Sequence, residues 1–328
     1  MWVIAVIIVV ILVTGLIYLV RVDGKFRVKR SLEIDAPLDS VFAAIVDLKA
    51  WPKWNPWLIH EPDTEIAYSD NHQAEGGYYS WSGKLTGAGK LTHLKITAGS
   101  SIRQQIEFLR PFKSTNQVSW EFENKDGSCL VSWEMSGKMP FLFRIKARKM
   151  ESTLGRDYEL GLALLNGYMN ASAPHPAFTF TGSEDLQNFS YWAIPCNGKL
   201  RQLETARRSS IEILRAATHG SKALALTLYH HFDPFASHFQ AEVAIPIGDK
   251  APPSNYTRRE FNGGRYFKMT LHGDYRYLPL GWHALYSHCR LHKVKFDLAR
   301  PALEIYHHDP DGLSDSKQVS SALYIPIR

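Results

Sequence analysis

The sequence predicts an α+β protein in which two strand-rich domains follow an apolar N-terminal helix. Three observations lead to this fold class. Residues 2–20 form an apolar run, residues 25–170 alternate like antiparallel strands before one long helix, and residues 181–328 contain the same pattern twice. At 328 residues the chain is long enough for two separate cores.

Composition argues against several other classes of protein. Hydrophobic residues make up 45% of the chain and charged residues 21%, which is typical of folded domains. The net charge is only +6, and the one basic cluster directly follows the apolar run, so no direct contact with nucleic acid is expected. The three scattered cysteines suggest no disulfide framework and fit a reducing compartment.

The apolar run predicts a single membrane-spanning helix. A helix over residues 2–20 would rise roughly 28 Å, enough to cross the hydrocarbon core. A cleaved signal peptide is the alternative, disfavoured because no basic residue precedes the run and no small-residue cleavage site follows it. Five cations follow closely: Arg21, Lys25, Arg27, Lys29 and Arg30. By the positive-inside rule they predict that the domains after this anchor lie in the cytoplasm.

Alternation predicts most of the first domain, over 25–170. A strand over 26–34 leads into a short helix over 40–48, and a series of strands follows from residue 78. Two of these strands, joined by a turn at Asp126-Gly127, place Trp120 and Trp133 on their inward faces. A long amphipathic helix over 143–169 closes the domain.

A tryptophan-rich segment lies between the short helix and the strands. It reads Trp-Pro-Lys-Trp-Asn-Pro-Trp over 51–57, which favours a bent helical turn that lays its indoles on one surface. With Trp54 on that surface, Trp54, Trp120 and Trp133 are candidates to line an apolar ligand cavity. The glutamates on the opposite strand faces are expected to be solvated.

This order of elements, together with the 51–57 segment and Gly-x-Gly-x-Leu at 87–91, resembles the helix-grip fold of the START and polyketide-cyclase (SRPBCC) superfamily. The resemblance implies a curved sheet that wraps the long helix and leaves an apolar tunnel between them. Some members are cyclases or hydrolases, but the inward faces here offer no paired acid and base. Binding of an apolar molecule is therefore expected.

A short linker over 171–180, rich in alanine and proline, is expected to join the two domains. Beyond it, Tyr-His-His-Phe-Asp-Pro at 229–234 recurs as Tyr-His-His-Asp-Pro at 306–310, and Ala-Ile-Pro-Ile at 244–247 recurs as Tyr-Ile-Pro-Ile at 324–327. Two copies of one unit, related by a pseudo-twofold axis, are predicted. Each copy is expected to contain a strand, a helix and two strands: 189–195, 202–217, 223–230 and 242–247, then 264–271, 277–290, 302–306 and 322–327.

The copies differ two residues before the repeated tyrosine, where the first has Thr227 and the second has Glu304. The string over 266–275, Trp282 in the helix, and the blocks over 303–310 and 323–327 resemble the gyrase-inhibitor-like effector-binding domain, which is also attached to many bacterial drug-sensing regulators. The resemblance implies a clamshell of two related halves with a ligand groove between them. It also implies that Glu304 meets cationic or polar aromatic ligands.

Glu304 on a central strand must be paired, protonated or open to a cavity. With Tyr275, Trp282 and Tyr306 nearby it would offer a charge and aromatic faces to an organic cation. The alternative is an internal salt bridge to Arg265, Lys268 or Arg276.

No metal site or cofactor is expected. His288 and His292 lie one helical turn apart beside Cys289, but no third ligand at a telling spacing accompanies them, so zinc or haem is disfavoured.

The leading hypothesis is a membrane-anchored bacterial protein that binds small hydrophobic or cationic molecules in two pockets, one of them anchored by Glu304. The alternatives are a small-molecule hydrolase that uses Glu304 with a nearby tyrosine, as some members of the resembling family do, and a lipid-binding protein at the membrane surface.

Overall fold

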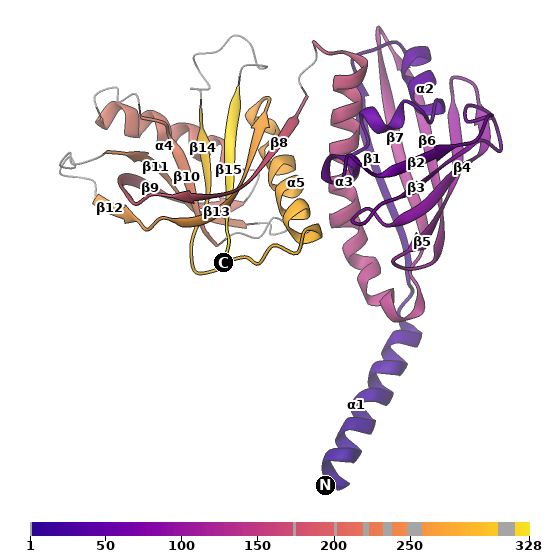
Figure 1. Ribbon diagram of the computed structural model, residues 1–328, viewed down its shortest axis with the longest axis horizontal. Coiled ribbons are helices and arrows are strands. Elements are labelled where there is room, and N and C mark those ends of the chain that lie inside the picture. The colour runs from indigo at the N-terminus through magenta and orange to yellow at the C-terminus, as the bar shows by residue number, and fades with distance from the viewer. Residues whose placement is uncertain are drawn as a thin grey trace. The chain divides into compact units, whose positions relative to one another are not determined.

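A computed structural model describes residues 2–172, 175–199, 202–218, 223–231, 238–247, 258–307 and 319–328 of the chain (Figure 1). The chain divides into two compact units, Met1–Ala173 and Pro174–Arg328. Each unit combines one antiparallel sheet with helices, which confirms the predicted α+β class. The expected connection between the two halves of the second domain, and the Asp-Pro ends of both repeated motifs, lie outside the described residues.

The N-terminal helix α1 (Trp2–Arg21) has a mean hydropathy of 3.2 over an 18-residue window, and none of that window is buried. Among the described residues it is the one helix long and apolar enough to cross a membrane. A membrane span and a signal sequence share this length and composition.

The first unit is built on a seven-stranded antiparallel sheet with the order β1-β7-β6-β5-β4-β3-β2. Its strands are β1 (Lys25–Ile34), β2 (Glu65–Tyr68), β3 (Tyr78–Ser82), β4 (Ala88–Thr97), β5 (Ser101–Arg110), β6 (Ser114–Lys125) and β7 (Ser128–Lys138). The short edge strand β2 was not predicted from the sequence. Trp120 and Trp133 are register partners on β6 and β7, and both side chains are buried, as their alternation predicted.

Five helical segments accompany this sheet: α2 (Leu38–Val46), η1 (Trp51–Lys53), η2 (Leu58–His60), η3 (Phe141–Lys146) and α3 (Ala147–Met169). The tryptophan-rich segment forms the short turn η1, as expected from its prolines. Helix α3 buries Leu154, Tyr158, Leu162 and Leu165, which recur at helical spacing and therefore form one stripe in the core cluster shared with the sheet. This is the predicted arrangement of a sheet around a closing helix.

Glu61 stabilises the turn between β3 and β4 by accepting hydrogen bonds from it. Its carboxylate accepts hydrogen bonds from the backbone N–H groups of Lys84 at 2.6 Å, Leu85 at 2.9 Å and Thr86 at 2.8 Å. A Cβ atom on Gly83 would lie 2.3 Å from a Glu61 oxygen, so glycine is required for this approach. Burial alone would raise the pKa of Glu61, but the hydrogen bonds outweigh it and lower the pKa to about 2.

We predict that Glu61→Gln destabilises the first unit by about 2 kcal/mol, because charge-assisted hydrogen bonds become neutral ones. A depressed carboxyl pKa stabilises the fold fully above its unfolded value near 4.5 and loses this effect as the pH falls toward about 2. The gap between wild type and variant should therefore be widest at neutral pH and shrink below about pH 4.5. Hydrogen exchange of the 84–86 amides between pH 3 and 7 measures it. A gap independent of pH would contradict this account.

The second unit is built on an eight-stranded antiparallel sheet with the order β12-β9-β11-β10-β14-β15-β13-β8. Its strands are β8 (Ala177–Leu186), β9 (Phe189–Lys199), β10 (Leu226–His231), β11 (His238–Pro246), β12 (Arg258–Phe261), β13 (Gly264–His272), β14 (Ala302–Tyr306) and β15 (Ser320–Pro326). Its helical segments are α4 (Leu203–Ala217), η5 (Tyr275–Tyr277) and α5 (Leu278–Leu291). The outer strands β8 and β12 were not predicted, and β8 begins inside the stretch expected to be linker.

The register of the central strands reveals the pseudo-twofold axis. Thr227 lies directly opposite Glu304, and the pairs on either side are Leu226 with Ile305 and Leu228 with Leu303. Since Thr227 and Glu304 hold equivalent positions in the two copies, the axis passes between them. The strand order is symmetric about the same point, with β10 and β14 at the centre and β11 and β15 outside them.

Candidate functional site

The first candidate site surrounds Glu304, which is 0% exposed in the middle of β14. Its carboxylate accepts a hydrogen bond from Trp282 Nε1 of α5 at one oxygen and from the Tyr306 hydroxyl, at 2.5 Å, at the other. The single hydroxyl proton of Tyr306 is used in the hydrogen bond to Glu304. In the contact of 2.6 Å between Thr227 Oγ1 and the Tyr306 hydroxyl, the threonine is therefore the donor. Both direct donors to the acid thus belong to the second copy, and Thr227 of the first copy supports one of them.

A cation also lies beside this carboxylate, but it is none of the three arginines and lysines considered from the sequence. Arg207 Nη1 of α4 lies 3.9 Å from Glu304 Oε2, and the Arg207 side chain is almost as buried as the acid. The sequence candidates are engaged elsewhere. Arg276 pairs with Asp274 and Lys268 with Glu184, and Arg265 bonds to Ser183. The proposed pairing of Glu304 with those three residues is therefore wrong.

Arg207 and Trp282 occupy equivalent positions in the two copies. Helix α4 begins at Leu203 and α5 at Leu278, so each of the two residues is the fifth of its helix. The pseudo-twofold axis places both helix positions around the same point, and the single acid at that point receives an indole from one side and a guanidinium from the other. The duplicated scaffold is symmetric, but the chemistry at its centre is not.

Aromatic rings form the walls around Arg207. Its guanidinium carbon lies 5.2 Å from the ring centroid of Tyr275 and 5.1 Å from that of Tyr306, within the range of cation–π contacts. The two tyrosine rings meet edge to face at 5.4 Å. Tyr229, the counterpart of Tyr306 in the first copy, packs edge to face on Trp282 at 5.6 Å. We call Arg207, Glu304, Tyr275 and Tyr306 the cation cage.

Burial controls protonation in this site. It raises the pKa of Tyr306 and of Tyr229 well above the usual value near 10, and the nearby carboxylate of Glu304 raises both further. Burial alone would lower the pKa of Arg207, but Tyr306 and Glu304 outweigh it and the pKa is raised. At neutral pH both hydroxyls keep their protons and the arginine keeps its charge.

The structure therefore brings together all four residues that the sequence nominated in this domain: Glu304, Tyr275, Trp282 and Tyr306. Sequence reasoning missed Arg207 and gave no role to Tyr229. A signal for Arg207 was present, because the two helices begin 75 residues apart, at Leu203 and Leu278, and this offset aligns Arg207 with Trp282.

The tryptophans of the first unit fill its interior. Trp120 stacks on Trp133 at a centroid distance of 4.5 Å, and Trp133 stacks on Tyr158 of α3 at 3.9 Å. Trp54 meets both indoles edge to face near 6 Å. Because sheet and helix touch through this stack, the apolar tunnel expected between them is occupied by side chains at this level. Trp54, Trp120 and Trp133 form a packed aromatic core here.

A buried polar chain runs outward from this core. Trp120 Nε1 donates to Gln104 Oε1 at 3.0 Å, and Gln104 Nε2 lies 3.3 Å from His93 Nδ1. His93 Nε2 contacts the carbonyl of Val46 at 3.0 Å, which fixes the proton on Nε2 because a carbonyl can only accept. Burial lowers the pKa of His93, which favours this neutral form. The chain ends at the last residue of α2.

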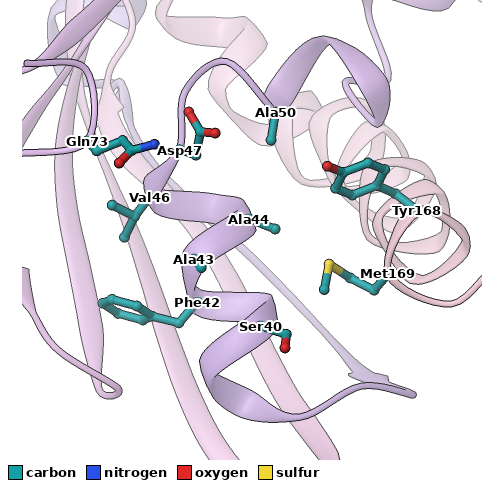
Figure 2. A pocket seen from close by; sticks show the side chains of 10 residues that line it. All are labelled: Ser40, Phe42, Ala43, Ala44, Val46, Asp47, Ala50, Gln73, Tyr168 and Met169. Atoms are coloured by element: carbon teal, nitrogen blue, oxygen red, sulfur yellow. The ribbon is translucent and has the colours of Figure 1, made fainter.

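A pocket of about 650 Å³ lies at that end of α2, beside the C-terminal turn of α3 (Figure 2). Figure 2 shows Ala44 and Ala50 turned toward Tyr168 and Met169 of α3. Small alanine side chains on α2 and just before η1 leave room that the aromatic ring and the thioether of α3 enclose from the other side. The sequence gave no indication of this pocket, since it arises where two helices distant in the chain meet.

The histidines of α5 are packed against aromatic rings. His288 stacks on Phe180 at 3.9 Å and lies 4.2 Å from His292, and burial lowers its pKa to about 4. Within the described ranges, no group of three or more histidine, cysteine, aspartate or glutamate side chains is placed to hold a metal ion.

Comparison with known proteins assigns both units to families. Residues 25–169 match the family described as "Polyketide cyclase / dehydrase and lipid transport", and residues 181–328 match the "GyrI-like small molecule binding domain". Both resemblances drawn from the sequence are confirmed. No curated protein matches the chain.

Solved structures similar to part of the chain include three proteins of low sequence identity. CalU16 from Micromonospora echinospora is 15% identical, with 44% of this chain and 85% of that chain covered and a TM-score of 0.32. Ara h 8.0201 is 12% identical, with 45% and 99% covered and a TM-score of 0.35. The Aha1 dimer from Colwellia psychrerythraea is 13% identical, with 44% and 95% covered and a TM-score of 0.33.

We predict strong coupling between Arg207 and Glu304. Replacing either residue by glutamine leaves the other charge buried without a partner. Each substitution should therefore destabilise the second unit by about 3 kcal/mol. The double variant should be less destabilised than the sum, with a coupling of roughly 1–3 kcal/mol.

Hydrogen exchange of the β10 and β14 amides in the full chain measures these changes for the second unit separately. The exposed neighbour Arg208→Gln is the matched control and should change little. Additive effects of the two substitutions would show that the charges do not interact.

Proposed function

We propose that this chain, which carries a polyketide cyclase-like domain followed by a GyrI-like domain, is a membrane-anchored small-molecule-binding protein. We further propose that its second domain takes flat aromatic cations at Glu304. The description of one matched family names polyketide cyclases and lipid transport, and that of the other names small-molecule binding. The observation that carries the finer proposal is the cation cage, in which a planar cation already lies against two tyrosine rings and beside a buried carboxylate.

Arg207 approaches the acid without a hydrogen bond to it. Its nitrogen is 3.9 Å from the carboxylate, beyond hydrogen-bond distance, whereas Trp282 and Tyr306 bond directly to the two oxygens. Rotation of the long arginine side chain would free the cage without moving a strand. A ligand with a planar cationic group could then take its place and bond the acid more closely. Arg207 therefore acts as an internal substitute for the ligand while the site is closed.

This exchange has a cost that limits affinity. The ligand must displace a charge-compensating side chain, so its apparent affinity equals its intrinsic affinity multiplied by the fraction of molecules in which Arg207 has left the cage. A neutral ligand gains nothing from the exchange, because it would leave the buried acid uncompensated. The cage thus selects cations over neutral molecules of the same shape.

Hydrolysis by Glu304 and a tyrosine is less well supported by this geometry. The raised pKa values keep Tyr229 and Tyr306 protonated, so neither is available as a base or as a phenolate nucleophile at neutral pH. The arrangement favours binding.

The pocket between α2 and α3 supports a second ligand, of apolar character, in the first domain. Its described lining combines alanines with Phe42, Val46, Tyr168 and Met169, next to the polar Ser40, Asp47 and Gln73, and the matched family includes lipid transport in its description. We propose that this pocket receives the acyl chain of a lipid-like molecule. The anchor α1 and the cations that follow it support a location at the cytoplasmic face of a membrane.

The cation cage predicts chemical rescue. Arg207→Gln vacates the position of the guanidinium, so phenylguanidinium should raise the melting temperature of this variant by several degrees and that of wild type by less. Phenylurea, of similar shape but neutral, should raise neither, and Glu304→Gln should abolish the effect. Arg208→Gln should behave as wild type. Equal stabilisation by the neutral and cationic compounds would refute a cationic ligand.

The pocket predicts loss of an apolar ligand when it is filled. Ala44→Trp places an indole between α2 and Tyr168, so native mass spectrometry of the purified chain should show less co-purified lipid-like material than in wild type. Asp39→Trp, at an exposed position of the same helix, is the matched control and should retain it. Identical adduct patterns in the two variants would exclude the pocket as the binding site.

A further inference from the structure

One end of the first unit concentrates exposed apolar side chains. Outside α1, seven large hydrophobic side chains of the described residues 22–172 are exposed, and four of them lie together on the tip between β5 and β6 and on η3. These four are Leu109 at 55%, Phe112 at 51%, Phe141 at 38% and Ile145 at 52% exposed. Isolated apolar side chains are normal on a protein surface, but a cluster indicates a contact.

The cluster is one surface rather than two. Phe112 on the strand tip packs against Phe143 of η3 with ring centroids 4.3 Å apart. The register brings the same elements together, since β5 pairs Phe108 with Ser114 of β6, and β1 pairs Lys25 with Lys138 of β7 at the same end of the sheet. We call Leu109, Phe112, Phe141 and Ile145 the apolar tip.

The apolar tip adjoins the N-terminal helix. Arg144 Nη1 lies 3.5 Å from the carbonyl of Leu19 in α1, and Met139 N donates to the carbonyl of Gly24 at 2.9 Å. A Cβ atom on Gly24 would lie 2.7 Å from the Arg144 side chain, so the connection between α1 and β1 runs tightly against η3. Figure 1 shows α1 leaving the first unit at the end where α3 begins. The surface that α1 leaves is therefore the surface that carries the apolar tip.

Five basic residues lie on the same segments as the apolar tip or at the adjoining end of β7: Arg110, Lys113, Lys138, Arg144 and Lys146. In the part of the chain that the structure describes, none of these five takes part in a salt bridge, whereas Arg27, Lys29 and Lys90 of the same sheet each have a carboxylate partner. Arg110 bonds instead to Ser82 and the Gly83 carbonyl, and Arg144 and Lys146 lie over the rings of Phe141 and Phe143. Apolar side chains beside cations that no carboxylate neutralises are the pattern of a surface that enters the headgroup region of a membrane with anionic lipids.

We propose that the apolar tip is a membrane-docking surface: Phe112 and its neighbours insert into the interface of an anionic bilayer while the nearby cations contact lipid phosphates. The first unit is then held against the membrane by α1 and by this surface together. This inference rests on the proposed membrane anchoring of α1, and it does not depend on either ligand.

The test uses the full chain in nanodiscs of phosphatidylcholine with 30% phosphatidylglycerol and a spin-labelled lipid, a composition we choose for its negative charge. A fluorophore is attached at Phe112→Cys or, as control, at Asp126→Cys in the turn between β6 and β7 at the opposite end of the sheet. The three native cysteines are buried and should not compete for the label. Quenching by the spin label should be several-fold at position 112 and near zero at position 126.

Charge dependence completes the test. In pure phosphatidylcholine, and in the triple variant Arg110→Gln, Lys113→Gln, Lys146→Gln, the quenching at position 112 should fall at least twofold, while the melting temperature stays the same. Equal quenching at positions 112 and 126, or quenching that does not respond to lipid charge, would overturn the proposal. Quenching that disappears when each nanodisc holds a single chain would assign the surface to contacts between copies instead.

Failure of the anchor is distinguishable from failure of docking. A chain that alkaline carbonate extracts from membranes has no anchor in α1. A chain that resists carbonate but shows no quenching at position 112 is anchored without docking.

Discussion

The second unit depends on one buried carboxylate at its centre. Glu304 lies on the pseudo-twofold axis, where a symmetric scaffold would place two identical side chains, and the chain instead supplies an acid opposite Thr227. Burying a charge is costly unless it is paired and hydrogen-bonded, and Trp282, Tyr306 and Arg207 together meet this requirement. Gene duplication would explain the architecture. The difference between Thr227 and Glu304 at equivalent positions then leaves a single acid at the centre.

The closed cage and a binding site are compatible because the partners of Glu304 differ in strength. The indole and the phenol bond the acid directly and belong to rigid elements, whereas the guanidinium approaches from a long side chain and stops short of hydrogen-bond distance. Under the proposed function the acid stays in place while its counter-ion is exchanged. In the first unit the opposite holds. Its central tryptophans are packed ring on ring, and the room for a ligand lies at the periphery, between α2 and α3.

Sequence patterns predicted the parts of this structure that depend on local periodicity. Alternation identified the inward faces of Trp120 and Trp133, and the repeated motifs identified the duplicated unit and the asymmetry between Thr227 and Glu304. Alternation does not predict how much free space remains between the sheet and the helix. The same inward tryptophans could line a cavity or fill it, and the distance between sheet and helix decides which of the two occurs. Nor could the counter-ion be found from nearby residues, because Arg207 reaches Glu304 across the pseudo-twofold axis from a helix in the other copy.

The most direct measurement of the central claim is a crystal structure of the second domain's site, determined on the full chain with phenylguanidinium bound. The account predicts the ligand against the rings of Tyr275 and Tyr306, in the position that the guanidinium now occupies, with its nitrogen atoms on the Glu304 carboxylate and the Arg207 side chain rotated away. A ligand bound elsewhere, with Arg207 still against the two rings, would contradict it.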